Sequence, residues 1–173
     1  MIGDSALTLQ SGLDEVDVIR ILREVKDPEV PVLDVVELGI VRGASVEGRR
    51  AIVRVTPTYS GCPAMKVIER EIAECLERHG FENVVVETTF VPPWTTDWIS
   101  AEAREKLRAY GIAPPGPAAA IELVPLGGPT RTIPCPYCGS SRTTTESEFG
   151  STACKSIHFC RSCHQPFEHF KAI

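Results

Sequence analysis

The chain of 173 residues carries 18 Lys and Arg against 23 Asp and Glu, a formal net charge of −5 that disfavours a general electrostatic hold on nucleic-acid phosphates. No uninterrupted apolar run approaches the roughly 18 residues of a membrane span, and Asp4 and Asp14 interrupt any signal-peptide pattern near the N-terminus. Because the seven cysteines are odd in number and four of them form C-x-x-C pairs, we expect reduced thiols that bind metal in a cytoplasmic protein without nucleic-acid or membrane partners.

The N-terminal part of the chain predicts a short arm and then a helix. Residues 1–12 show no hydrophobic period, and we interpret them as a flexible arm. From Leu13 to Val25 apolar residues recur at three-residue steps, which predicts the first helix. Pro28 ends it, because a proline disfavours helical geometry at the preceding residue, and neither Pro28 nor Pro31 can donate a backbone hydrogen bond.

Strands and two further helices are predicted up to residue 112. Residues 40–46 and 51–56 predict an antiparallel hairpin around Gly48, and residues 84–90 a third strand. A second helix is expected from Pro63 to about His79, and a third over residues 101–110 between caps at Ser100 and Gly111. These elements favour an α/β (α+β) fold over residues 13–112, in which a compact small sheet packs on helices.

The composition changes after residue 112. Residues 113–132 hold five Pro and three Gly among twenty, which is typical of a linker, although residues 121–124 could form a brief strand. The 41 residues from 133 to 173 hold five of the seven cysteines and are too few to bury a large core unaided. We therefore predict a separate small module over residues 133–173.

Four cysteines of this module have the spacing of a metal site. Two C-x-x-C turns, Cys135–Cys138 and Cys160–Cys163, are separated by 21 residues, as in two knuckles that close a tetrahedral site. A structural Zn²⁺ held by four thiolates would supply the stability that so small a core lacks, so we predict a four-cysteine zinc ribbon. A pair of disulfides or an iron–sulfur cluster are the alternatives. Cys154 lies outside both turns and is either a packing thiol or a redox or metal-binding residue.

Cys62 follows the predicted strand 51–56 and precedes the second helix. If Pro63 is the first helical residue, Cys62 is the N-cap, and the free amides of the first turn favour its thiolate, which suits nucleophilic attack or soft-metal ligation. The alternative is a plain strand-to-helix turn. His79 lies about 25 Å away at the other end of the helix, so a Cys–His pair would need a histidine from the ribbon. Cys75 lies on the apolar face of the helix and is expected in the core.

Two acidic and two aromatic residues remain open between functional and structural roles. Asp27 and Glu29 flank Pro28 and are either metal ligands or orienting acids, or else carboxylates that cap a turn. Trp94 and Trp98 either pack the third helix onto the sheet or form a docking surface.

Three motifs, taken in order, resemble a known family: Asp27-Pro-Glu-Val-Pro31, Asp34-Val-Val-Glu-Leu-Gly39 and Thr56-Pro-Thr-Tyr-Ser-Gly-Cys-Pro63. They are similar to the SufT-like iron–sulfur assembly domain, and with residues 94–99 and the ribbon the chain from about residue 13 to 173 resembles the PaaD-like accessory proteins of phenylacetyl-CoA epoxidase systems. The resemblance implies a compact α/β domain that assembles or delivers iron–sulfur clusters, with Cys62 as the residue tied to that role.

The resemblance also implies a function in aerobic phenylacetate degradation. The partners it implies are the di-iron oxygenase and the iron–sulfur reductase of the epoxidase. The chain has no Glu-x-x-His pair of a di-iron bundle and no glycine-rich nucleotide motif, so we expect no catalytic activity from the chain alone. We predict a maturation factor in which Cys62 transiently holds iron or a cluster, with Asp27 and Glu29 as weaker candidates.

Several features of this role remain open at the level of sequence. Because one thiol cannot hold a cluster alone, a homodimer could supply further ligands. The ribbon, on its Pro-rich tether, is expected to dock the client. A non-catalytic structural subunit of the oxygenase is the first alternative, and a zinc ribbon that binds nucleic acid is the second.

Overall fold

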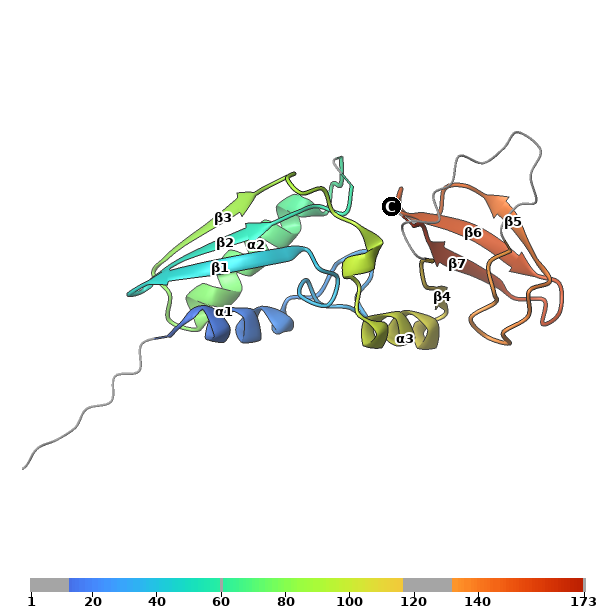
Figure 1. Cartoon of the computed structure of the whole chain (residues 1–173), viewed down its shortest axis with the longest axis horizontal. Helices are drawn as coiled ribbons and strands as arrows, with labels where there is room; N and C mark the ends of the chain where they lie inside the picture. Colours follow the sequence, from blue (N-terminus) through green and yellow to red (C-terminus); the bar gives the residue numbers. More distant parts are fainter. Residues whose placement is uncertain (1–12, 60, 117–131, 173) are drawn as a thin grey trace, which may run out of the picture.

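The computed structural model describes residues 13–59, 61–116 and 132–172. The predicted arm, most of the predicted linker and the possible strand at 121–124 lie outside these residues. Within them the chain forms mixed helices and strands, in agreement with the predicted fold class. The elements, labelled as in Figure 1, are α1 (Glu15–Ile21), η1 (Leu22–Glu24), β1 (Val41–Glu47), β2 (Arg50–Val55), α2 (Met65–Arg78), β3 (Asn83–Thr88), η2 (Thr96–Trp98), α3 (Ala101–Tyr110), β4 (Ile112–Ala113), β5 (Thr143–Ser147), β6 (Lys155–Cys160) and β7 (Pro166–Phe170).

The first sheet has the strand order β1-β2-β3 and follows from the local sequence. β1 and β2 form the predicted antiparallel hairpin, and β2 pairs in parallel with β3 after the crossover through α2. A crossover helix is required here because parallel neighbours cannot be joined by a tight turn. In Figure 1 α2 lies against this sheet, and its apolar face buries Ile68, Ile72 and Leu76 in the core.

The helix ends differ from the predicted ones at two places. α1 begins after a capping box, in which Asp14 and Asp17 exchange hydrogen bonds, but it ends at Ile21 and tightens into η1. α2 begins at Met65, with Ala64 and not Cys62 at the N-cap position. The prediction that Cys62 caps this helix is therefore wrong. Met65 N–H bonds back to the Cys62 carbonyl in a tight turn, and the first helical bond runs from Ile68 N–H to the Ala64 carbonyl.

The third helix has the predicted bounds. Ser100 Oγ accepts the Ala103 N–H at 3.1 Å, and Gly111 adopts the left-handed conformation that ends a helix, with φ of 93°. The chain then continues straight into β4 instead of a linker.

The second sheet belongs to the ribbon and has the order β4-β7-β6-β5. β5 pairs antiparallel with β6, and β6 pairs antiparallel with β7. β4 lies partly within the segment predicted as linker, and it pairs in parallel with β7. Ala113, the first residue of the predicted linker, is a buried strand residue opposite His169.

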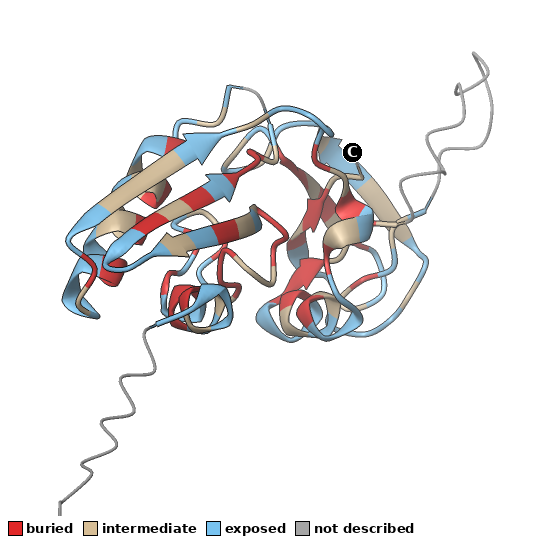
Figure 2. Ribbon diagram, turned by 60° about the vertical axis from the view of Figure 1, so that its left-hand side comes forward, coloured by how far each residue is buried: buried red, intermediate tan, exposed pale blue. Residues whose placement is uncertain are grey.

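The ribbon packs against the N-terminal part, so that the main core extends across both. Cys154 and Phe170 are buried in the same apolar cluster as the residues of α1, α2 and the first sheet. The rings of Phe170 and Trp94 lie 6.1 Å apart, and Trp94 donates its indole N–H to the Leu38 carbonyl at 3.0 Å. Figure 2 shows buried segments both in the first sheet and in the ribbon strands. Trp94 therefore has the packing role, and the described ribbon is docked on its own chain.

The other tryptophan, Trp98, is half-buried. The Arg42 guanidinium lies 3.5 Å above its ring centroid. Trp98 lies so close to Gly39 that a Cβ added at Gly39 would be 2.8 Å from the Trp98 Cβ. Among the described residues, no helix is both long and apolar enough to cross a bilayer.

Candidate metal centres

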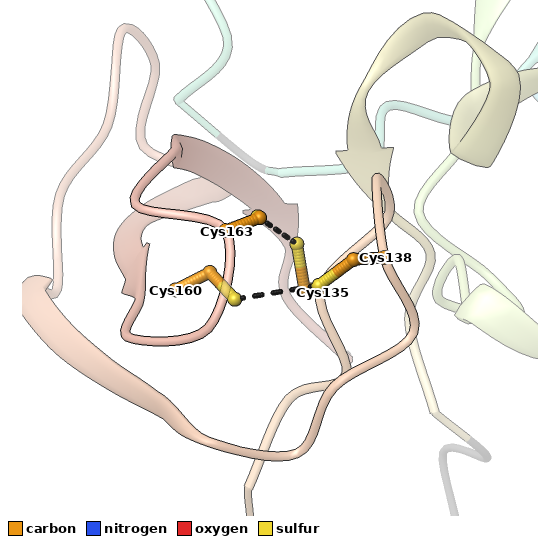
Figure 3. Close-up of side chains that lie close together, drawn as sticks. All are labelled: Cys135, Cys138, Cys160 and Cys163. Carbon is orange, nitrogen blue, oxygen red and sulfur yellow. Dashed lines mark hydrogen bonds between the residues drawn. The ribbon is translucent and has the colours of Figure 1, made fainter.

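The structure brings the four ribbon cysteines of the two C-x-x-C turns together (Figure 3). Cys135 and Cys138 precede β5, Cys160 is the last residue of β6, and Cys163 lies in the turn between β6 and β7. Their four sulfurs lie within 4.8 Å of one another, with the Cys135–Cys163 pair at 3.7 Å and the Cys138–Cys160 pair at 3.6 Å. Four sulfurs at about 2.3 Å from one tetrahedral Zn²⁺ are about 3.8 Å apart. The donor set therefore fits a single tetrahedral ion.

The two turns have the same backbone design. In each, the residue after the second cysteine donates its N–H to the carbonyl of the first, Gly139 to Cys135 and His164 to Cys160, at 2.9 Å in both. Both donors adopt positive φ, 72° for Gly139 and 57° for His164. This conformation curls each turn so that its two sulfurs face the same point, as metal knuckles require.

The thiols of the ribbon differ in their pKa. The backbone N–H groups of Cys163 and Ser162 hold the pKa of Cys160 at about 6. Burial and the neighbouring thiols raise the pKa of Cys163 to about 12. A cluster of four thiols of this kind cannot ionise fully by itself, and a divalent cation supplies the missing positive charge.

Cys62 lies at the second candidate site, next to a small cavity. This cavity has a volume of about 40 Å³ and is lined by residues of the N-terminal part and of the loop before β6: Glu29, Thr58, Tyr59, Gly61, Cys62, Pro63, Ala153 and Cys154. Cys62 is half-buried there. Gly61 leaves space for the Tyr59 ring, because a Cβ at this position would lie 3.1 Å from Tyr59 Cε1.

The thiolate expected at Cys62 is not favoured in this structure. Burial, and then the carboxylates of Glu29 and Asp27, raise the pKa of the Cys62 thiol above its ordinary value, against one hydrogen bond from the Ala64 N–H. The expectation failed because the helix begins three residues after Cys62. The resting state is therefore a thiol, whose proton a metal ion would displace.

The two acidic candidates occupy different environments. Asp27 is buried, and its Oδ1 accepts the N–H groups of Glu29 and Val30 at 2.8 and 2.7 Å, so it caps the turn. Burial raises its pKa. Glu29 faces the Cys62 cavity, and its Oε2 lies 3.9 Å from Cys154 Sγ. Burial and the nearby Asp27 raise the Glu29 pKa.

The sequence left the role of Cys154 undecided, and the structure places it beside Cys62. Cys154 is buried and lines the same cavity. Its thiol also contacts Thr152 Oγ1 at 3.1 Å. The ribbon thus contributes a thiol to a site that sequence reasoning built from the N-terminal domain alone.

Cys75 is fully buried, as predicted, and its Sγ lies 3.8 Å from the Ile21 carbonyl oxygen. The Cys75 sulfur, a carboxylate oxygen of Glu24 and a ring nitrogen of His79 nevertheless lie within 4.8 Å of one another, and all three side chains are of types that bind metal ions. His79 bonds through Nδ1 to the Cys75 carbonyl and through Nε2 to Glu24, at 2.9 and 3.2 Å. Because Cys75 does not line the Cys62 cavity, it serves as the control thiol for experiments on Cys62.

Comparison with known proteins decides the family. A profile described as the PaaD zinc beta ribbon domain matches residues 122–171. A protein of Escherichia coli (strain K12), whose name describes it as a subunit of 1,2-phenylacetyl-CoA epoxidase, is 44% identical over 158 residues, covering 91% of this chain and 92% of that protein. The chain belongs to the PaaD family. The resemblance drawn from the sequence motifs is thereby confirmed.

The N-terminal half of this PaaD-family chain has relatives of its own. A profile described as iron–sulfur cluster assembly protein matches residues 15–90. The "Fe-S protein maturation auxiliary factor" of Porphyromonas gingivalis (strain ATCC BAA-308 / W83) is 38% identical over 96 residues, which cover 54% of this chain and 90% of that protein. The crystal structure of a domain of unknown function, DUF59, from Bacillus anthracis is 27% identical over 54% of this chain and 90% of its own, with a TM-score of 0.51.

Two features of this PaaD-family chain were missed by the sequence analysis. One is the cavity that Cys154 and Cys62 both line, and the other is the ion pair of the buried Lys155 with the half-buried Glu168, with Nζ 2.9 Å from Oε2. Neither has a sequence signal, because 91 residues separate the two cysteines and no spacing rule relates them. Only the isolation of Cys154 from the C-x-x-C turns marked it as unexplained.

Proposed function

We propose that this protein is a non-catalytic accessory factor that matures the iron or iron–sulfur centres of a phenylacetyl-CoA epoxidase system. Cys62 is its transient ligand for iron or a cluster. The observation that carries the proposal is the position of Cys62 at a cavity lined by a second thiol and a carboxylate, within the region that matches iron–sulfur assembly proteins. The E. coli relative named for the epoxidase supports the choice of client.

The chemistry of the cavity suits temporary binding. A half-buried thiol that is neutral at rest binds a soft metal ion only by losing its proton, so protons compete with the metal. Such competition favours release when a client offers more thiolates. Among the described residues no histidine lines this cavity, so the described part of the chain does not form the Cys–His pair of a thiol nucleophile there.

We further propose that the ribbon cysteines hold a structural Zn²⁺. Cys135, Cys138, Cys160 and Cys163 would be its ligands, and the ion would fold the ribbon without an open position for a substrate. The separations of 3.6 and 3.7 Å between sulfurs favour one ion over an iron–sulfur cluster, whose thiolates are spread over several irons. Residues 13–112 then form the assembly domain and residues 133–173 the ribbon.

Anaerobic reconstitution tests the role of Cys62. Wild type, Cys62→Ser and the control Cys75→Ser are loaded with Fe²⁺ and sulfide and freed of unbound metal, and iron and zinc are counted. We expect zinc in all three proteins, and iron above background only in wild type and Cys75→Ser. Equal iron in wild type and Cys62→Ser would remove Cys62 from the mechanism.

A structural component of the epoxidase complex is the second candidate, favoured by the word "subunit" in the name of the E. coli relative. The two candidates differ after maturation is complete. Oxygenase and reductase are matured with this protein present, and it is then removed by an affinity tag. A maturation factor leaves the epoxidase active, whereas removal of a structural component abolishes turnover.

A further inference from the structure

Two thiols from distant parts of the chain face one cavity. Cys62 comes from the turn before α2 and Cys154 from the turn before β6, and both line the cavity of about 40 Å³ together with Glu29. Cys154 is buried although it belongs to neither C-x-x-C turn. The docked ribbon thus completes a site that the N-terminal domain alone would leave with a single thiol.

The backbone around Cys154 is fixed by several hydrogen bonds. Its carbonyl accepts the Lys171 N–H at 2.9 Å, and Gly150 N–H bonds to the Lys155 carbonyl at 2.8 Å. Ser151 N–H bonds to Glu168 Oε1 at 3.0 Å, and Thr152 Oγ1 contacts the Cys154 sulfur. These bonds hold the thiol in place, as the partners of a metal ligand commonly do.

The charges around the cavity favour a cation. Glu29 points its carboxylate toward Cys154, at 3.9 Å, and Asp27 lies buried in the same turn. The nearest buried cation, Lys155, is paired with Glu168 at 2.9 Å and donates to the Glu29 carbonyl at 3.3 Å. The carboxylates of Asp27, Glu29 and Glu168 therefore surround a single ammonium group, that of Lys155. A bound cation would offset the excess negative charge.

We propose that Cys62 and Cys154 together hold one thiophilic divalent ion, with Glu29 as a third ligand. The three ligand atoms are not all within 4.8 Å of one another in this structure, so binding draws the side chains together across the cavity. This inference rests on the proposed function of Cys62 and identifies its partner as a thiol of the same chain. Binding releases the two thiol protons to solvent and forms two metal–thiolate bonds, without change of oxidation state. Two thiolates and a carboxylate suit Fe²⁺ and also bind Zn²⁺ or Cd²⁺.

Cadmium-113 NMR of the full-length protein tests the proposal. Wild type, Cys62→Ser, Cys154→Ser and Cys75→Ser are reconstituted anaerobically with ¹¹³Cd²⁺ as the only metal. Wild type and Cys75→Ser are expected to bind two equivalents and to show two resonances, one from the four-cysteine ribbon and one from the composite site. Cys62→Ser and Cys154→Ser are expected to bind one equivalent and to keep only the ribbon resonance, which also reports that the ribbon is folded.

The other outcomes separate the inference from the proposed function. If Cys62→Ser loses the second resonance and Cys154→Ser keeps it unshifted, the composite site is refuted while the role of Cys62 stands. If both variants keep the second resonance, Cys62 has no role as a ligand either. Loss of the second resonance in Cys75→Ser would then assign that resonance to a site formed by Glu24, Cys75 and His79. If Cys154→Ser loses the ribbon resonance as well, its ribbon is not folded, and Glu29→Gln is then tested in place of Cys154→Ser. An unshifted second resonance in Glu29→Gln overturns the inference.

Discussion

Phe170→Ala tests whether the ribbon is part of the main core. The Phe170 ring is 1% exposed and packs against Trp94. A buried phenylalanine removes about 150 Å² from water, which at about 25 cal/mol per Å² corresponds to about 4 kcal/mol, within the range of about 3–5 kcal/mol for Phe→Ala in cores. We expect the free energy of unfolding to fall by about 4 kcal/mol and Tm by about 10 °C.

Tryptophan fluorescence during urea unfolding is the appropriate assay. The two tryptophans of the chain, Trp94 and Trp98, both precede the ribbon, so their signal reports the N-terminal part. Phe149→Ala is the matched control, because Phe149 is an exposed ribbon phenylalanine and its removal should cost no more than about 0.5 kcal/mol. If Phe170→Ala leaves the tryptophan transition at the wild-type urea concentration, the ribbon is not docked on this core.

Three further predictions concern charges and the ribbon metal. Burial alone would raise the pKa of Glu37, but Lys106 and a backbone amide hold it below its ordinary value. Glu37→Gln should therefore lower the free energy of unfolding by about 1 kcal/mol at pH 7. In urea titrations this difference should disappear as the pH falls below about 4.5. Asp27→Asn keeps the acceptor for both amide bonds, and because burial raises the Asp27 pKa, wild type should lose stability relative to this variant as the pH rises above about 3.8; a constant difference from pH 3 to 7 would contradict this. Removal of the ribbon metal by a chelator should shift the tryptophan transition to lower urea, and the shift should be absent in Phe170→Ala if docking transmits it.

The sequence predicted the elements whose signals are local. α3 has both of its predicted ends because Ser100 and Gly111 are strong caps, and the four ribbon cysteines were found because their spacing is itself a local pattern. Helix α2 was predicted with the wrong start. Pro63 suits the first position of a helix, but in the structure Met65 N–H bonds to the Cys62 carbonyl in a turn, and the helix begins only after it.

The site at Cys62 depended on tertiary structure that local patterns do not contain. The pKa of Cys62 is set by burial and by carboxylates 33 and 35 positions earlier, whereas the sequence argument considered only the amides of the following helix. The composite cavity depends on how the ribbon packs, and the Pro-rich composition after residue 113 suggested a tether instead. A strand as short as β4 gives no periodic signal, so its pairing with β7 could not be foreseen.

Iron transfer to a client tests the central claim most directly. The protein is loaded anaerobically with ⁵⁵Fe²⁺, mixed with the apo form of the iron–sulfur reductase of the epoxidase system and sulfide, and separated by size, with a chelator present to trap free iron. We predict that wild type and Cys75→Ser deliver ⁵⁵Fe to the reductase and restore its cluster absorption, whereas Cys62→Ser delivers none. Equal delivery from Cys62→Ser and wild type would contradict the account.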